Sequence, residues 1–192
     1  ILDGRIYGEP TVYPYFSACT KGEFLNEILK YKDKHGTAIH TLIAAMDLTL
    51  RIEPGRSALD QAGITVAQVA FRKYDSQGEL LIGLEMNRTQ LRSGSADFLL
   101  DPIHIPMGDA KEDPKPVKGY LVGAYCLEQE LILKREIQFE QLPEVGDIVV
   151  FINTAGYMMH FYESEAHLFE LAKNVIYSPK AKAFTLDDAR TD

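Results

Sequence analysis

A turn at Glu53–Arg56 places a carboxylate and a guanidinium close together in the sequence. Its Pro-Gly centre is typical of a tight turn, and the alternation at Leu48–Ile52 predicts a short strand before it. A guanidinium is a planar fork that suits phosphate or carboxylate, and a carboxylate could pair with a protonated ring nitrogen. On spacing alone, a surface turn whose two charged ends pair with each other is favoured.

A second candidate is Cys126, which lies in the segment Gly123–Glu130 between small residues and acidic residues. Nearby negative charge disfavours a thiolate, but a neutral thiol could still act as an acid. Burial in the core is the commoner fate of a cysteine. The other cysteine, Cys19, has no polar context and is given no role.

A third candidate is Tyr157, which follows an apolar stretch and two small residues. Small residues let a backbone approach a ligand closely, and the tyrosine hydroxyl could donate a hydrogen bond to a phosphate. The alternative is a tyrosine at a strand end with an ordinary hydrogen bond.

Composition excludes several classes of function. The formal net charge is -8, which argues against a nucleic-acid-binding protein. The two cysteines and five histidines show no spacing typical of disulfides or metal ligands. No apolar run is long enough to span a membrane. The start at Ile1–Arg5 predicts a fragment without a signal peptide, and few cysteines favour a cytoplasmic protein.

The first sixty residues predict an α/β arrangement. Apolar spacing predicts a helix at 20–34. A second helix is predicted at 37–46, entered near Gly36, and is followed by the strand at 48–52. A helix, a strand and a Pro-Gly turn in succession are typical of an α/β barrel, whose functional groups lie on the loops after the strands.

After Gly63 the pattern changes to short β segments. We expect a hairpin with its turn at Asp75–Gly78. We also expect an extended segment, a proline-rich loop and a short amphipathic helix, at 101–106, 107–118 and 163–171. The predicted strands are 64–72, 79–85, 120–125, 130–139 and 147–153. The sequence therefore predicts a mixed α/β chain, with the end of a TIM-like barrel at 1–60 and an antiparallel β-barrel or sandwich at 61–192.

Taken in order, these motifs resemble the fold-type III pyridoxal-phosphate-dependent decarboxylases, which include diaminopimelate, ornithine and arginine decarboxylases. The matching segments are Glu53–Arg56, Ala62-Gly63, Gly123–Cys126 and Ala155–Tyr157. The resemblance spans roughly residues 48 to 170.

The resemblance implies a role for each matching residue. Glu53 would pair with the pyridine nitrogen of pyridoxal phosphate and keep it protonated. Gly55, Arg56 and Tyr157 would lie at the cofactor phosphate. Cys126 would cross a homodimer interface into the site of the other subunit and help to protonate the product.

Substrate recognition is where the sequence departs from the family. The resemblance implies that Arg92, aligned with a one-residue gap, binds a distal carboxylate of an amino-acid substrate. The family usually has an acidic residue directly after the cysteine, but here Leu127 stands there and the acid is Glu128. Successive strand residues face opposite ways, so Glu128 faces away from the substrate unless a bulge re-aims it. The substrate therefore stays unassigned.

The lysine that holds the cofactor and the glycine-rich phosphate loop belong to the amino-terminal barrel in this family, and this sequence has no counterpart for either. We therefore expect the chain alone to be inactive. Two other interpretations stay open, a non-catalytic relative and an amino-acid racemase. Glu53 disfavours the racemase, which uses an arginine at the ring nitrogen, and the joint presence of Arg56, Cys126 and Tyr157 disfavours the non-catalytic relative.

Overall fold

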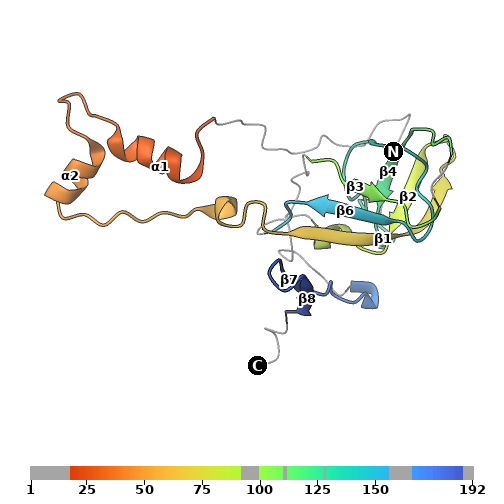
Figure 1. The fold of residues 1–192 in the computed structure, drawn as a ribbon. Helices are drawn as coiled ribbons and strands as arrows, with labels where there is room; N and C mark the ends of the chain where they lie inside the picture. The colour runs from red at the N-terminus through yellow and green to blue at the C-terminus, as the bar shows by residue number, and fades with distance from the viewer. Residues whose placement is uncertain (1–17, 92–99, 110–111, 128, 156–165, 188–192) are drawn as a thin grey trace. The chain divides into compact units, whose positions relative to one another are not determined.

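The computed structural model describes residues 18–91, 100–109, 112–127, 129–155 and 166–187 (Figure 1). The chain divides into two compact units that meet in the sequence between Asp60 and Gln61. Each unit is described by itself below.

In its described part, the unit before Gln61 contains two short helices, α1 at Lys21–Lys30 and α2 at Ile39–Ala45. Both lie within the predicted ranges. Glu23 in the first turn of α1 and Lys30 in its last turn complement the helix dipole. Neither helix has a buried residue. In the apolar face predicted for α1, Phe24 and Ile28 are exposed and Leu25 and Leu29 are half-buried.

The predicted strand at 48–52 is not formed. Residues 48–54 have no regular secondary structure, because within the described residues no neighbouring strand pairs with this backbone. Leu48, Leu50 and Ile52 are all at least half exposed. The assignment of 1–60 to the end of a barrel therefore stays a prediction.

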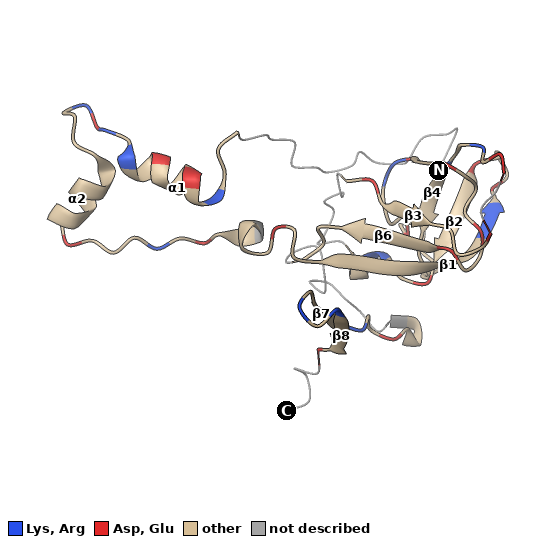
Figure 2. Ribbon diagram, viewed as in Figure 1, with Lys and Arg blue, Asp and Glu red and all other residues tan. Residues whose placement is uncertain are grey.

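The described part of the second unit is mainly β, with a six-stranded, nearly closed, barrel-like sheet in the order β3-β6-β1-β2-β4-β5. The strands are β1 Ile64–Tyr74, β2 Leu80–Leu84, β3 Ile103–Ile105, β4 Val117–Val122, β5 Ile137–Phe139 and β6 Ile148–Ile152. Charged residues lie mostly on α1 and on loops, whereas β6 and most of β1 are uncharged (Figure 2).

The predicted hairpin is present, with β1 and β2 antiparallel around the turn at Asp75–Gly78. The expectation of a purely antiparallel domain is wrong, because β2 pairs with β4 in parallel. The chain between these strands includes β3, which pairs with β6 at the far side of the sheet. The chain thus leaves the hairpin and returns, and this crossover lets β4 run in the same direction as β2.

Several boundaries differ from the predicted ones. The predicted loop at 107–118 ends two residues early, because β4 begins at Val117, and of the predicted strand at 130–139 only β5 is formed. In the described part of 163–171, a single 3-10 turn at Ala166–Leu168 replaces the helix. A second hairpin, formed by β7 at Val175–Ser178 and β8 at Ala183–Leu186, was not predicted.

The core lies on the inner face of the six strands. Alternate residues of β2, namely Leu80, Ile82 and Leu84, are buried, and they pack in one cluster with Val149 and Phe151 of β6. The hydrophobic effect on this inner face holds the sheet in its curved form.

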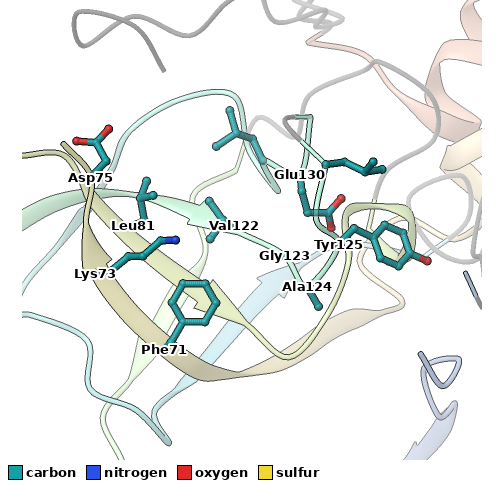
Figure 3. A pocket seen from close by; sticks show the side chains of 11 residues that line it. Phe71, Lys73, Asp75, Leu81, Val122, Gly123, Ala124, Tyr125 and Glu130 are labelled. Carbon is teal, nitrogen blue, oxygen red and sulfur yellow. The ribbon is translucent and has the colours of Figure 1, made fainter. Parts of the chain in front are cut away.

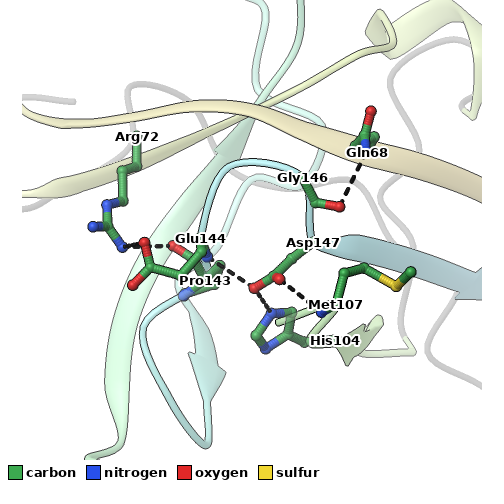
Figure 4. Close-up of polar contacts among 8 residues, drawn as sticks. All are labelled: Gln68, Arg72, His104, Met107, Pro143, Glu144, Gly146 and Asp147. Atoms are coloured by element: carbon green, nitrogen blue, oxygen red, sulfur yellow. Dashed lines mark hydrogen bonds and ion pairs between the residues drawn. The ribbon is translucent and has the colours of Figure 1, made fainter. Parts of the chain in front are cut away.

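A polar network around Asp147 ties the start of β6 to β3 (Figure 4). The buried Asp147 carboxylate accepts hydrogen bonds from Nε2 of His104 at 2.8 Å and from the backbone N–H groups of Met107 and Glu144 at 2.9 and 2.8 Å. Beside it, Arg72 of β1 donates to the carbonyl of Pro143 at 3.0 Å and pairs with Glu144 at 2.6 Å.

Candidate functional site

The turn at Glu53–Arg56 is exposed and tightly folded. Gly55 has a φ of +53°, a left-handed conformation that favours glycine, and it begins a 3-10 turn that runs to Ala58. The backbone N–H and the hydroxyl of Ser57 both donate to the carbonyl of Pro54. The structure places the Glu53 side chain in solvent and describes only the backbone of Arg56, and the pairing of these two side chains stays a prediction.

Cys126 lies in the loop that follows β4, and its side chain is exposed. The alternative of a cysteine buried in the core is therefore wrong for this residue. It stands between Tyr125, which is 7% exposed, and Leu127, which is 50% exposed. An accessible thiol is a requirement for any chemical role of this residue.

The backbone of this loop is held at several points. The N–H of Ala124 donates to the carbonyl of Met86 at 2.8 Å, and the N–H of Gly123 donates to the carbonyl of Glu130 at 3.1 Å. The ring of Tyr125 contacts His167 and Phe169, with centroids 5.1 and 5.7 Å apart. The exposed thiol thus lies next to a well-anchored aromatic residue.

An ion pair beneath the loop was missed by the sequence analysis. Glu130 is 4% exposed, and its Oε1 accepts a hydrogen bond from the N–H of Arg88 at 2.7 Å. Its Oε2 lies 3.6 Å from Nε of Arg88, which is an ion-pair contact longer than a hydrogen bond. The sequence offered only weak signals, an acidic residue at the start of a predicted strand and an arginine 42 positions earlier.

Arg88 begins a short 3-10 turn, Arg88–Gln90, whose amino-terminal end has a capping box. The Asn87 side chain accepts from the N–H of Thr89 at 2.9 Å, and the Gln90 side chain accepts from the N–H of Asn87 at 2.9 Å. This capping box fixes the backbone from which Arg88 reaches Glu130.

Three predicted site residues, Arg92, Glu128 and Tyr157, lie outside the described residues. Glu53 and Gly55 belong to one compact unit and Cys126 to the other. The structure therefore supports the local features of the turn and of the cysteine loop, and their assembly into one site stays a prediction.

Within the described ranges, no group of three or more histidine, cysteine or acidic side chains could hold a metal ion. In the same ranges, no helix is both long enough and apolar enough to cross a membrane.

No protein-family model matches the chain. It is 35% identical over 158 residues to the uncharacterized protein y4yA of Sinorhizobium fredii (strain NBRC 101917 / NGR234). The match covers 81% of this chain and 34% of that protein, so the chain spans about a third of the length of this relative.

Solved structures show a likeness of fold. A diaminopimelate decarboxylase is 17% identical with a TM-score of 0.61, over 77% of this chain and 36% of the other. A carboxynorspermidine decarboxylase from Campylobacter jejuni, complexed with norspermidine, is 16% identical with a TM-score of 0.58, over 77% and 41%. A diaminopimelate decarboxylase from M. jannaschii, in co-complex with L-lysine, is 19% identical with a TM-score of 0.55, over 82% and 37%.

The chain has the fold of the β domain of these decarboxylases. At these identities the likeness shows a shared fold, and function must be argued from the residues of the site.

Proposed function

We propose that this chain is the carboxy-terminal part of a pyridoxal-phosphate-dependent amino-acid decarboxylase. The observation that carries the proposal is the occurrence of the Glu-Pro-Gly-Arg turn, and then an exposed Cys126, in a chain whose β domain has the decarboxylase fold. Fold alone would leave the chemistry open. The Glu-Pro-Gly-Arg turn adds side chains that suit a phosphorylated pyridine cofactor, and Cys126 adds an accessible thiol that can donate a proton.

The residues of the turn fit pyridoxal phosphate by their chemistry. The Glu53 carboxylate suits a protonated pyridine nitrogen, and the guanidinium of Arg56 suits a phosphate. A Cβ added at Gly55 would meet no atom within 4 Å, so its backbone is open to a phosphate oxygen. In the proposed enzyme, Tyr157 adds a hydroxyl donor to the same phosphate.

When bound, pyridoxal phosphate supplies an electron-accepting ring for the bond that breaks during decarboxylation. Glu53 holds a proton on the ring nitrogen and so keeps the ring electron-poor. Cys126 donates a proton to the carbon from which carbon dioxide has left. Arg92 and Glu128 contact the far end of the substrate, whose identity is open because Leu127 stands where the family has an acid.

The proposed enzyme is a homodimer in which Cys126 of one subunit serves the turn of the other. A cysteine on an exposed loop, rather than in the core, is compatible with such a contact. Mixing a Cys126→Ala variant with a Glu53→Gln variant of the longer protein should restore activity through hybrid dimers. Failure of the mixed subunits to recover activity, with exchange shown by mass, would contradict the shared site.

The direct test uses the longer protein from which we propose that this chain derives. It should bind pyridoxal phosphate covalently. The bound cofactor should give visible absorbance, and reduction with borohydride should leave the protein with a permanently increased mass. It should then release carbon dioxide from at least one member of a panel of amino acids. Racemisation without carbon dioxide release would favour the racemase, and no cofactor binding would favour the non-catalytic relative.

The role of Cys126 can be tested with one variant at the proposed site and one control variant at an exposed position. Cys126→Ala should lower the rate at which the protonated amine product forms by about a hundredfold, within the usual range for loss of one acid–base group. Cofactor binding should be unchanged. Glu112→Gln, at an exposed position of the β domain, should leave both quantities unchanged.

A further inference from the structure

A cavity of about 380 Å³ lies on the outer face of β1, β2 and β4, beside the connection between β4 and β5 (Figure 3). All its lining residues belong to the second compact unit. No residue of the Glu53–Arg56 turn lines it, and the proposed function assigns it no ligand.

The strand register forms one wall of the cavity. Phe71 and Lys73 of β1 are paired with Gly83 and Leu81 of β2, so their side chains share one face. Gly83 is in turn paired with Val122 of β4. The intervening β2 residues point into the core, which leaves this outer face available to solvent or to a ligand.

Two glycines shape the space. A Cβ at Gly83 would lie 2.1 Å from Cε1 of Phe71, so the absence of a side chain lets this ring pack against the strand backbone. A Cβ at Gly123 would lie 2.2 Å from Oε1 of Glu130. The cavity therefore depends on two positions at which any side chain would displace a lining residue.

Among the described residues that line the cavity, the charged ones are Lys73, Asp75 and Glu130. The Asp75 carboxylate accepts from the N–H groups of Glu79 and Gln77 at 3.0 and 2.8 Å, and these bonds hold its pKa below the usual value. Glu130 is paired with Arg88. Both acids are thus engaged by the protein itself.

Lys73 differs from these two acids. Within the described part of the chain, no carboxylate lies within ion-pair distance of its ammonium, which stands 5.6 Å from the centroid of the Phe71 ring. Figure 3 shows the ammonium directed toward Val122. The cavity therefore offers one available positive charge against walls that include Leu81, Val122 and Leu131.

We propose that this cavity binds a small carboxylate with an apolar tail. The carboxylate pairs with Lys73, and the tail lies against the leucine and valine side chains. The ion pair supplies the preference for an anion, and the buried tail supplies the hydrophobic part of the affinity. This inference stands independently of the proposed decarboxylase activity.

Occupation of the cavity has a consequence for Cys126. The residues on either side of it, Tyr125 and Leu127, both line the cavity. A bound ligand in contact with both neighbours restricts the loop, and the Cys126 thiol should then react more slowly with an alkylating reagent.

The test measures binding of hexanoate to the 192-residue chain by calorimetry, with hexanamide and hexylamine as neutral and cationic counterparts of the same length. Because Lys73 is exposed, we expect hexanoate to bind about three- to fivefold more tightly than either counterpart. Lys73→Gln should weaken hexanoate binding by about the same factor, and Lys73→Arg should preserve it. Lys115→Gln, at an exposed lysine outside the cavity, should have no effect.

The second readout is the rate of Cys126 alkylation by iodoacetamide in a Cys19→Ser background. Saturating hexanoate should slow this rate severalfold in the parent protein and leave it unchanged in Lys73→Gln. The proposal is overturned if hexanoate does not bind, if the amide or amine binds equally well, or if Lys73→Gln binds like the parent protein.

Discussion

The Asp147 carboxylate joins the segment around β3 to the turn before β6, since His104, Met107 and Glu144 all donate to it. In an Asp147→Asn variant, an amide N–H₂ replaces one oxygen and faces donors. We expect a loss of about 2 kcal/mol in the free energy of unfolding, typical of a buried acceptor removed from its donors. Urea denaturation measures the loss. Asp109→Asn, at an exposed site, should change stability by less than about 0.5 kcal/mol.

The same carboxylate should make stability depend on pH. Burial raises the pKa of Asp147, but the hydrogen bonds from Glu144, Met107 and His104 outweigh it and hold the folded-state pKa below the ordinary value of 3.8. The stabilisation is therefore fully present above pH 3.8 and is lost as the pH falls through the folded-state pKa. The difference in unfolding midpoint between the parent protein and Asp147→Asn should shrink over that acidic range. A difference that stays constant down to complete acid unfolding would contradict this role.

Gly123 tests the packing beneath the cysteine loop. A Cβ there would meet Oε1 of Glu130 at 2.2 Å and the carbonyl oxygen of Met86 at 2.8 Å. Gly123→Ala should therefore destabilise the domain by about 1–3 kcal/mol, the usual cost of overpacking. Gly108→Ala is the matched control, because a Cβ there meets nothing within 4 Å. Equal melting temperatures for the two variants would show that the loop can move aside.

At the scale of elements, the hairpin formed by β7 and β8 should be the least stable part of the described β domain. Its residues are almost all exposed, including Ile176 and Phe184 at 55% and 69%, and a two-stranded hairpin is marginal in water by itself. By contrast, β1 has strands on both sides. Hydrogen exchange should replace the amide protons of the hairpin far sooner than those of β1. Equal protection would show that another surface covers the hairpin.

Local sequence signals predicted the elements that depend on local chemistry. Helical spacing located α1, and the Asp75–Gly78 turn located the β1–β2 hairpin. A helix was also predicted where α2 lies. Long-range pairing was not visible in the same way. The parallel contact of β2 with β4 depends on where β3 pairs, and the segment at 48–52 shows that alternation without a partner does not make a strand.

In the candidate site, too, features set by neighbouring residues could be predicted from the sequence, and features set by long-range contacts could not. The tight turn at Gly55 could be predicted, because proline fixes its own φ angle and glycine readily adopts the positive φ that the turn needs. The Arg88–Glu130 ion pair could not, because its members are 42 residues apart and come together only through the fold. The exposure of Cys126 was likewise decided by the loop after β4 rather than by its neighbours in sequence.

At the scale of the whole molecule, the chain covers 34% to 41% of the relatives described above. The proposed enzyme therefore depends on residues beyond this chain, and its activity must be measured on the longer protein. In the proposed enzyme, Glu53 and Cys126 act on the cofactor ring and on the product carbon, and they belong to separate compact units. Of these, Glu53 tests the cofactor assignment most directly.

The decisive measurement is single-turnover decarboxylation by a Glu53→Gln variant of the longer protein at saturating pyridoxal phosphate. Glutamine keeps the shape of the side chain but removes the negative charge that holds the proton on the ring nitrogen. Cofactor affinity should fall only modestly, because Arg56 and Tyr157 still bind the phosphate in the proposed site. The rate of decarboxylation should fall by roughly two to three powers of ten, about 3–4 kcal/mol of transition-state stabilisation. A near-normal rate would contradict the account and reduce Glu53 to a residue of a surface turn.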